Sequence, residues 1–248
     1  MTETSAQYRR PPSYNLHMMS ESASTIDVLF EDHHLIAVHK PTGVLTQAPP
    51  QVPSMEAMVK EYIKVKYAKP AGVYLGIPHR LDRPVAGVVL FCRNTKAAQR
   101  VAEQFQQHTV EKVYWAWVAG NFPEEAGEWR DHLRKIAETA KAGVVPAGEP
   151  GAKEAITGFR VLCRRETETL LELKPRTGRM HQLRIQSASR GFPILGDELY
   201  GSDRPFGPAA ELPRDRLIAL LARRLTITHP FRDERLTIES RLPDAFVI

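Results

Sequence analysis

Residues 79–87, HRLDRPVAG, form the most informative stretch of this chain. They place one carboxylate, Asp82, between the guanidinium groups of Arg80 and Arg83, and they lead directly into the apolar run VVLF at 88–91. An apolar run of this kind predicts a buried strand, and a loop beside a rigid strand can present a charged side chain for catalysis. Asp82 is therefore the first candidate for a functional group.

A second cluster lies far along the chain and consists of RTGRMHQLR at 176–184 and GFPILGD at 191–197. Three further segments are IAVHKPTGVL at 36–45, KVYWAWVAG at 112–120 and LTITHP at 225–230. Together, and in the order in which they occur, these blocks resemble the RluA-type pseudouridine synthase family. The signatures of that family are HRLD before a Gly-apolar run, and TGR-x-HQ-[IL]-R before G-x-P-I-x-GD.

The periodicity of apolar residues predicts an α+β fold, because strands outnumber helices without a regular βαβ alternation. Helices are expected after an N-cap at Ser54, after an N-cap at Thr95 to about Gln107, and from about His181 to Gly191. Strands are expected within 26–46 and at 112–119, 156–163, 169–174, 224–228 and 235–239. The resemblance implies the pseudouridine synthase fold, a largely antiparallel mixed central sheet with helices and loops around a basic cleft.

Composition predicts which segments are loops and where the catalytic domain begins. Residues 121–155, rich in Gly, Pro, Ala and charge, are predicted to leave the sheet as a long excursion, and 202–216 to form a surface loop. Residues 1–24 are polar and are expected to form a mobile N-terminal arm, so that 25–248 is the catalytic domain.

Bulk properties exclude some classes of protein. No apolar run reaches about 18 residues, so no membrane span is expected, and the polar N-terminus lacks the apolar core of a secretory signal. The cysteines, Cys92 and Cys163, lack metal-like spacing and fit a reducing compartment. We therefore expect a monomer in the cytoplasm.

The distribution of charge is more informative than the formal net charge of +5. No lysine follows Lys174, and residues 176–241 hold twelve arginines against eight acids. Arginine can donate two hydrogen bonds to a phosphate and can stack on bases, so this bias favours an RNA-contacting face. Codon usage that replaces Lys by Arg explains the same pattern equally well.

The resemblance implies roles for three residues. Conversion of uridine to pseudouridine breaks the N1–C1′ bond, rotates the uracil and rejoins it through C5. Asp82 matches the catalytic aspartate, which either adds to C1′ or assists loss of the 2′-proton. Arg184 matches the arginine that pairs with it, and an ionised carboxylate in a partly dry cleft needs such a counter-charge. Tyr114 matches the tyrosine that stacks on the flipped uracil and helps to remove the C5 proton.

Four further residues, Arg80, Arg83, Arg179 and His181, are candidate RNA contacts, although Arg179 and His181 could instead hold the local turn. The chain departs from the family pattern at two places. It has Val85-Ala86-Gly87 where Thr-Ser-Gly or Thr-Thr-Gly is usual, and Leu221 where His is frequent. Neither departure touches Asp82, Tyr114 or Arg184, so the activity is still expected. The departures leave the choice of RNA open.

The leading interpretation is an RNA pseudouridine synthase acting on rRNA or tRNA without a cofactor or metal. A non-catalytic RNA-binding paralogue of the same fold is the alternative, although such a protein would be expected to lack Asp82, Tyr114 or Arg184. A third possibility, a metal-dependent hydrolase using His79, Asp82 and His181, lacks a compact ligand motif such as HExxH.

Overall fold

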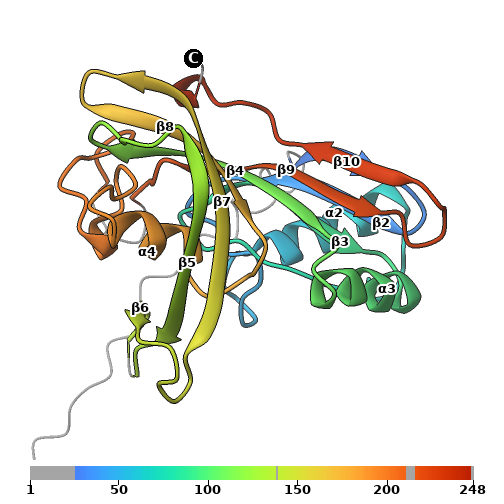
Figure 1. The fold of residues 1–248 in the computed structure, drawn as a ribbon. Coiled ribbons are helices and arrows are strands. Elements are labelled where there is room, and N and C mark those ends of the chain that lie inside the picture. The colour runs from blue at the N-terminus through green and yellow to red at the C-terminus, as the bar shows by residue number, and fades with distance from the viewer. Residues whose placement is uncertain (1–25, 138, 211–215, 247–248) are drawn as a thin grey trace, which may run out of the picture.

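The computed structural model describes residues 26–137, 139–210 and 216–246. In this part of the chain, a single mixed sheet of ten strands forms the framework, in the order β1-β2-β3-β9-β4-β8-β7-β5-β6 with β10 paired to β9 (Figure 1). The strands are β1 (Asp27–Glu31), β2 (Leu35–Lys40), β3 (Ala86–Cys92), β4 (Glu111–Ala119), β5 (Ala126–Lys135), β6 (Ala142–Val145), β7 (Lys153–Arg165), β8 (Glu168–Pro175), β9 (Leu220–Thr228) and β10 (Arg235–Glu239).

Only β3 and β9 pair in parallel among these strands, and the other neighbouring pairs are antiparallel. The predicted α+β class and the largely antiparallel mixed sheet are therefore confirmed. The predicted C-terminal hairpin is also present, with β9 beginning four residues earlier than expected, at Leu220.

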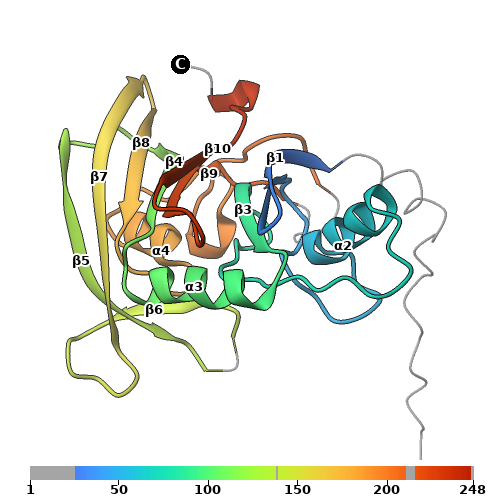
Figure 2. The ribbon, with the colours of Figure 1, turned by 90° about the vertical axis from the view of Figure 1, so that its right-hand side faces the viewer.

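Two helices cover opposite faces of one end of the sheet, as Figure 2 shows for α2 (Met55–Lys66) and α3 (Thr95–Gln106) around β3. Alternation along β3 explains this arrangement, because successive side chains of a strand point to opposite faces. Val89 and Phe91 pack in the cluster that contains Val59 and Ile63 of α2, whereas Val88, Leu90 and Cys92 pack with Ala97 and Val101 of α3.

The starts of these two helices follow from their caps. Ser54 accepts a hydrogen bond from the Ala57 amide at 3.3 Å, as the sequence predicts. The second cap was expected to be Thr95 but is Asn94, whose Oδ1 accepts from the Ala97 amide at 2.9 Å. Asparagine is preferred over threonine as an N-cap. The predicted cap was therefore one residue too late.

The expectation for residues 121–155 was wrong, because this stretch contributes β5, β6 and the start of β7 to the sheet. The many charged residues of β5 concealed the alternation of buried and exposed side chains along the strand. Trp129 and Leu133 are buried on one face of β5, while Arg130 is exposed and forms ion pairs with Glu128 and Glu154. Cross-strand ion pairs satisfy the polar face of such a strand, which composition alone cannot reveal.

The remaining expectations concern the loops and ends. Residues 202–210 contain no helix or strand, in agreement with the predicted loop, whereas 211–215 and the predicted arm at 1–24 lie outside the described residues. Cys92 and Cys163 are both free thiols, Cys92 buried and Cys163 partly buried. No helix within the described ranges is long and apolar enough to cross a membrane.

Candidate active site

The loop that carries Asp82 enters β3 at a point where backbones approach closely. Gly87 has a φ of +122°, and a Cβ at this position would lie 2.2 Å from the carbonyl oxygen of Ala222. Gly87 and Ala222 are partners in the parallel pairing of β3 with β9. Only glycine fits this contact, which fixes the start of β3 and with it the catalytic loop.

Two side chains, Lys40 at the end of β2 and Thr46 in the turn that follows, hold the same loop. Lys40 Nζ donates to the carbonyl oxygens of Pro41 at 2.9 Å, Val44 at 2.7 Å and Arg83 at 3.1 Å. Thr46 Oγ1 donates to the Leu81 carbonyl at 3.0 Å and accepts from the Leu81 amide at 3.1 Å. The residues on either side of Asp82 are thus held to the 41–46 turn.

Lys40 is fully buried, and burial lowers the pKa of its amine to about 7, an effect that the negative charge of Asp82 partly opposes. Lys40 therefore holds the backbone around Asp82 in place and does not reach solvent.

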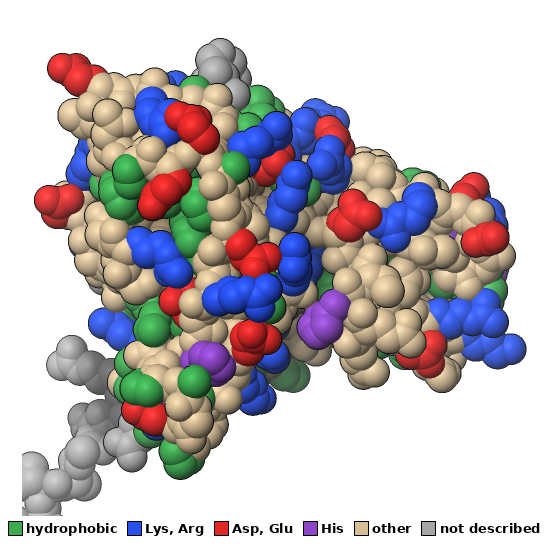
Figure 3. All heavy atoms as spheres, in the orientation of Figure 1, with side chains coloured by type: hydrophobic (Ala, Val, Ile, Leu, Met, Phe, Trp, Pro, Cys, Tyr) green, Lys and Arg blue, Asp and Glu red, His purple; other side chains and the backbone are tan. Residues whose placement is uncertain are grey.

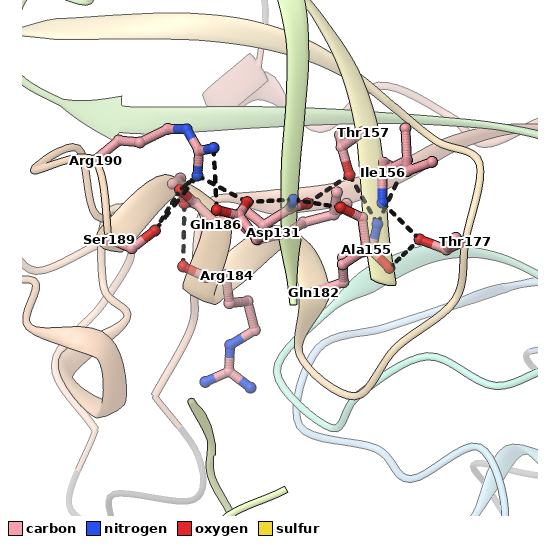
Figure 4. A network of polar contacts seen from close by, with 12 residues as sticks. Asp131, Ala155, Ile156, Thr157, Thr177, Gln182, Arg184, Gln186, Ser189 and Arg190 are labelled. Atoms are coloured by element: carbon pink, nitrogen blue, oxygen red, sulfur yellow. Dashed lines mark hydrogen bonds and ion pairs between the residues drawn. The ribbon is translucent and has the colours of Figure 1, made fainter. Parts of the chain in front are cut away.

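Helix α4 (Gln182–Ala188) provides the other wall of the site, and a buried polar network holds it against β5 and β7 (Figure 4). Gln186 accepts from Thr157 Oγ1 at 2.6 Å and donates to Asp131 at 2.7 Å. Gln182 donates to Thr157 Oγ1 at 2.9 Å and accepts from Thr177 Oγ1 at 2.8 Å. Arg184 extends away from this network in Figure 4, so one side of the helix anchors it while another carries the functional cation.

Arg184 lies beside Asp82 as expected, but its shorter contacts are with another carboxylate. Arg184 donates two hydrogen bonds of 2.7 Å to Asp197, one from Nε and one from Nη2. Its Nη1 lies 3.5 Å from Asp82 Oδ2, which is an ion pair but a longer one. The sequence placed Arg184 beside Asp82 correctly but missed Asp197, whose side chain is 1% exposed.

His181 approaches the same oxygen from another direction. Its Nε2 lies 3.7 Å from Asp82 Oδ2, and its Nδ1 lies 2.8 Å from Tyr200 Oη. Helix α4 was predicted to begin at His181, but His181 is its N-cap, in the left-handed region with φ 53°. The helix ends at Ala188, ahead of Gly191. Gly191 has a positive φ, and its amide donates a hydrogen bond to the Ala188 carbonyl, which closes the following turn.

Tyr114 and Lys112 reach the cleft from the same face of β4, as alternation predicts. Burial raises the pKa of the Tyr114 phenol, and the nearby charge of Asp82 adds to this effect. Burial also lowers the pKa of Lys112 to about 8, and its Nζ donates to the Thr177 carbonyl at 3.2 Å. Of the neighbouring tryptophans, Trp117 fills the core, whereas Trp115 is only partly buried beneath Arg223.

The other candidate RNA contacts differ in how they are held. Arg80 is exposed and makes no hydrogen bond or ion pair with the described residues. Arg83 Nε donates to the Gly43 carbonyl at 2.8 Å, and Arg179 Nε donates to the Glu154 carbonyl at 2.9 Å. Arg80 therefore keeps its whole guanidinium available, while the other two arginines share theirs with the protein.

These residues meet at an open cleft. A volume of about 680 Å³ lies on the side of Tyr114 and Lys112, and a second of about 760 Å³ lies on the side of Asp197 and the 140–141 turn. Asp82 and His181 line both volumes. The first is lined by four Lys and Arg side chains and one carboxylate, so the cleft is basic as predicted.

The outer surface is more mixed than the cleft. On the face in Figure 3, Lys and Arg side chains run down the middle of the molecule with Asp and Glu side chains between them. Basic side chains thus dominate the first volume of the cleft, whereas both signs of charge are mixed on the face in Figure 3.

Of the three residues of the metal-hydrolase alternative, His79 is engaged away from Asp82 and His181. His79 Nε2 accepts a hydrogen bond from the Leu90 amide at 2.9 Å, and burial, with a smaller effect of Lys112, lowers its pKa to about 4. The ring also stacks on Phe105. In the described parts of the chain, no three or more His, Cys, Asp or Glu side chains form a group that could hold a metal ion.

Comparison with known proteins agrees with this geometry. The sequence profile described as RNA pseudouridylate synthase matches residues 34–189. The chain belongs to this family. It is 32% identical over 240 residues to tRNA pseudouridine synthase C of Salmonella typhimurium, covering 90% of this chain and 87% of that protein.

Two further relatives extend the comparison. Ribosomal large subunit pseudouridine synthase C of Vibrio cholerae is 30% identical over 234 residues, covering 94% of this chain and 70% of that protein. The structure of human RNA pseudouridylate synthase domain containing 4 superposes with a TM-score of 0.74 at 25% identity, covering 92% of this chain and 93% of that one. The RluA-type pseudouridine synthase fold and family are confirmed, and the chain is an RNA pseudouridine synthase, an intramolecular isomerase.

Sequence reasoning missed two residues of the RNA pseudouridine synthase site. Asp197 closes the G-x-P-I-x-GD segment, where an acid within an apolar stretch was itself a signal of a buried partner. Tyr200 lies three residues further on, in the short helix η1 (Glu198–Tyr200), and carried no signal of its own.

Proposed function

We propose that the protein converts uridines of tRNA or rRNA to pseudouridine with Asp82 as the catalytic carboxylate. The observation that carries this proposal is the position of Asp82. Its side chain is 32% exposed between both volumes of the cleft, with Arg184 Nη1 and His181 Nε2 directed at the same oxygen, Oδ2. The names of the tRNA and rRNA synthases similar to this chain support the two RNA classes.

The chemistry needs a single carboxylate at the sugar. Cleavage of the N1–C1′ bond develops positive charge at the sugar, which an ionised Asp82 stabilises, either by adding to C1′ or by assisting loss of the 2′-proton. A second carboxylate to activate water, as in a glycosidase, is not required because water takes no part in the rearrangement. The uridine must leave the stack to reach this group, and the cleft beside Asp82 is large enough for a flipped nucleoside.

Arg184 and Tyr114 have separate tasks in this proposal. Arg184 holds positive charge beside Asp82, with Nη1 at 3.5 Å from Oδ2. Tyr114 stacks on the detached uracil, and its phenol assists removal of the C5 proton. Because burial keeps the Tyr114 phenol protonated, it enters the reaction as a neutral phenol. As it takes the C5 proton it passes its own hydrogen to an acceptor, for which the nearby Asp82 carboxylate, once released from the sugar, is the candidate.

We also propose that Arg80 and Arg179 contact RNA phosphates, whereas Arg83 holds the catalytic loop. Residues 25–248 are proposed to act as one catalytic domain, since all ten strands of the described residues belong to one sheet. We also propose that the protein is a monomer in the cytoplasm. A dimer in solution at assay concentrations would contradict the monomer.

The test of the catalytic assignment is Asp82→Asn, which keeps the shape of the side chain but removes the carboxylate. Product formation should be lost while RNA affinity stays near that of the wild type. Asp233→Asn, in the turn between β9 and β10, is the matched control and should be fully active. If Asp82→Asn kept more than about one-hundredth of wild-type turnover, the assignment would be wrong.

A separate experiment addresses the alternative of a non-catalytic RNA-binding paralogue. A wild-type protein that binds tRNA and rRNA but produces no pseudouridine in either, when total RNA is sequenced with and without the gene, would favour the paralogue.

A further inference from the structure

Tyr200 occupies a position that the catalytic scheme above does not use. Its Oη lies 2.8 Å from His181 Nδ1, and its ring lies 5.1 Å from the guanidinium carbon of Arg184. His181 and Arg184 are the two groups that approach Asp82 Oδ2. Tyr200 therefore stands directly behind both neighbours of the catalytic carboxylate.

The hydrogen bonds around Tyr200 fix the direction of each proton. The Ala142 amide donates to Tyr200 Oη at 2.9 Å, which occupies an acceptor position of the phenol oxygen. The phenol hydrogen remains to be donated, and His181 Nδ1 is the acceptor within reach. A neutral imidazole that accepts at Nδ1 carries its hydrogen on Nε2.

The other side of the ring leads to the same tautomer. His181 Nε2 lies 3.7 Å from Asp82 Oδ2. With the hydrogen on Nδ1, the Nε2 lone pair would face an anionic oxygen, which is repulsive, whereas an Nε2–H is attracted to it. Burial lowers the pKa of His181, so the ring is neutral near neutral pH although Asp82 opposes this shift.

The charges that face His181 come from several elements. Asp82 and Arg80 lie on the catalytic loop, Arg184 on α4 and Asp197 just before η1. Arg80 and Arg184 favour the neutral ring, and Asp82 and Asp197 favour the charged one. The hydrogen bond from Tyr200 adds a directional constraint that these charges do not supply.

The backbone of His181 lies in the left-handed region, with φ 53°. Histidine, asparagine and aspartate are the residues other than glycine that are enriched in this region.

We propose that Tyr200 and His181 are positioning residues, in which Tyr200 holds His181 as the Nε2–H tautomer so that this hydrogen orients Asp82 for attack at the sugar. The proposal rests on the assignment of Asp82 as the catalytic carboxylate. His181, one of the candidate RNA contacts, thus acts on Asp82 rather than on RNA. Because His181 and Arg184 both face Oδ2, Asp82 Oδ1 is the oxygen proposed to meet the substrate.

The tautomer can be measured directly in the wild-type protein. Long-range proton–nitrogen spectra of the ¹⁵N-labelled enzyme distinguish the two neutral tautomers of each histidine, and the signal lost in His181→Asn identifies His181. Asparagine suits this variant because it tolerates the left-handed backbone. We expect the Nε2–H form in the wild type and a mixture in Tyr200→Phe. An Nδ1–H ring in the wild type would overturn the proposal.

Kinetics provide the second test. Tyr200→Phe removes one oxygen, and the single-turnover rate should fall by about 10-fold with RNA affinity unchanged. Tyr74→Phe, at an exposed tyrosine, is the matched control and should match the wild type. The double variant Tyr200→Phe/His181→Asn should be no slower than His181→Asn alone, because both changes act through one group. Additive losses, or loss of affinity in place of rate, would refute the positioning role.

The failures of the two proposals are distinguishable. Activity in Asp82→Asn would remove the catalytic assignment whatever the histidine tautomer. An inactive Asp82→Asn together with a Tyr200→Phe enzyme of wild-type rate would leave Asp82 in place and overturn the role of Tyr200 alone.

Discussion

Arg184 and Asp197 form a buried, two-pronged ion pair in which Nε donates to Oδ2 and Nη2 to Oδ1, both at 2.7 Å. Asp82 receives only the remaining nitrogen, Nη1, at 3.5 Å. The pairing is therefore unequal. Asp197 fixes the guanidinium by two short hydrogen bonds, and Asp82 faces its positive charge without a tight ion pair. An Asp82 held in this way would stay free to act at the sugar in the proposed reaction.

This relationship predicts the behaviour of Asp197 variants. Asp197→Ala should lower the free energy of unfolding by about 3–5 kcal/mol, because it leaves a buried guanidinium without its main partner. Asp197→Asn keeps an acceptor and should be more stable than Asp197→Ala. Its turnover should still fall, because Arg184 would move closer to Asp82. Chemical denaturation and single-turnover rates measure the two effects. Wild-type turnover in Asp197→Asn would show that the orientation of Arg184 is not set by Asp197.

Much of this site could be predicted from the sequence, because each family motif is one continuous segment of the chain. Asp82, Tyr114 and Arg184 do meet at the cleft, and the helix at Ser54 begins where its cap predicts. Local periodicity and capping decide such features, and they are visible in the sequence.

The features that the sequence did not reveal depend on distant partners. Asp197 and Tyr200 act through Arg184 and His181, contacts that only the folded chain creates. Residues 126–135 were missed for the same reason, since their charged face is stabilised across to Glu154 of β7. Composition reports the exposed side of such a strand and conceals its buried side.

Tyr114→Phe tests the phenol separately from the ring. The ring still stacks on uracil, so RNA affinity and folding should be unchanged, while turnover should fall by about 100-fold or more because the hydroxyl that relays the C5 proton is gone. Single-turnover assays with purified RNA measure the loss. Unimpaired product formation would leave Tyr114 a packing residue of the cleft.

Lys112 predicts a pH dependence of RNA binding. Its pKa is lowered to about 8, so the amine is charged below this pH and loses its charge above it. If the charged amine meets a phosphate of the bound RNA, affinity should be full below pH 8 and fall as the pH rises through that value. Titrations of RNA binding from neutral to alkaline pH measure this.

Lys112→Arg is the matched control, because a guanidinium stays charged over the whole range and its affinity should not change with pH. Lys112→Met should bind weakly at every pH. A pH dependence that survived in Lys112→Arg would assign it to another group.

Gly87→Ala tests the junction between β3 and β9. The added Cβ would meet the Ala222 carbonyl at 2.2 Å, and backbone cannot yield as a flexible side chain does. We expect a loss of at least about 4 kcal/mol and a melting temperature lower by about 10 °C. Gly72→Ala, where nothing lies within 4 Å, is the control and should melt like the wild type. Equal melting temperatures for the two variants would contradict the close approach.

The arginines of the catalytic loop should separate by function. Arg80 is exposed and uncommitted among the described residues, so Arg80→Ala should weaken RNA binding and reduce the slope of log affinity against log salt by about one, as for loss of one phosphate contact. Arg83 instead donates to the Gly43 carbonyl, so Arg83→Ala should leave that slope unchanged and lower stability by about 1 kcal/mol. Binding at several salt concentrations and thermal melting measure both. If Arg83→Ala alone changed the salt slope, Arg83 would be the phosphate contact, and the loop would be held by Lys40 and Thr46 without it.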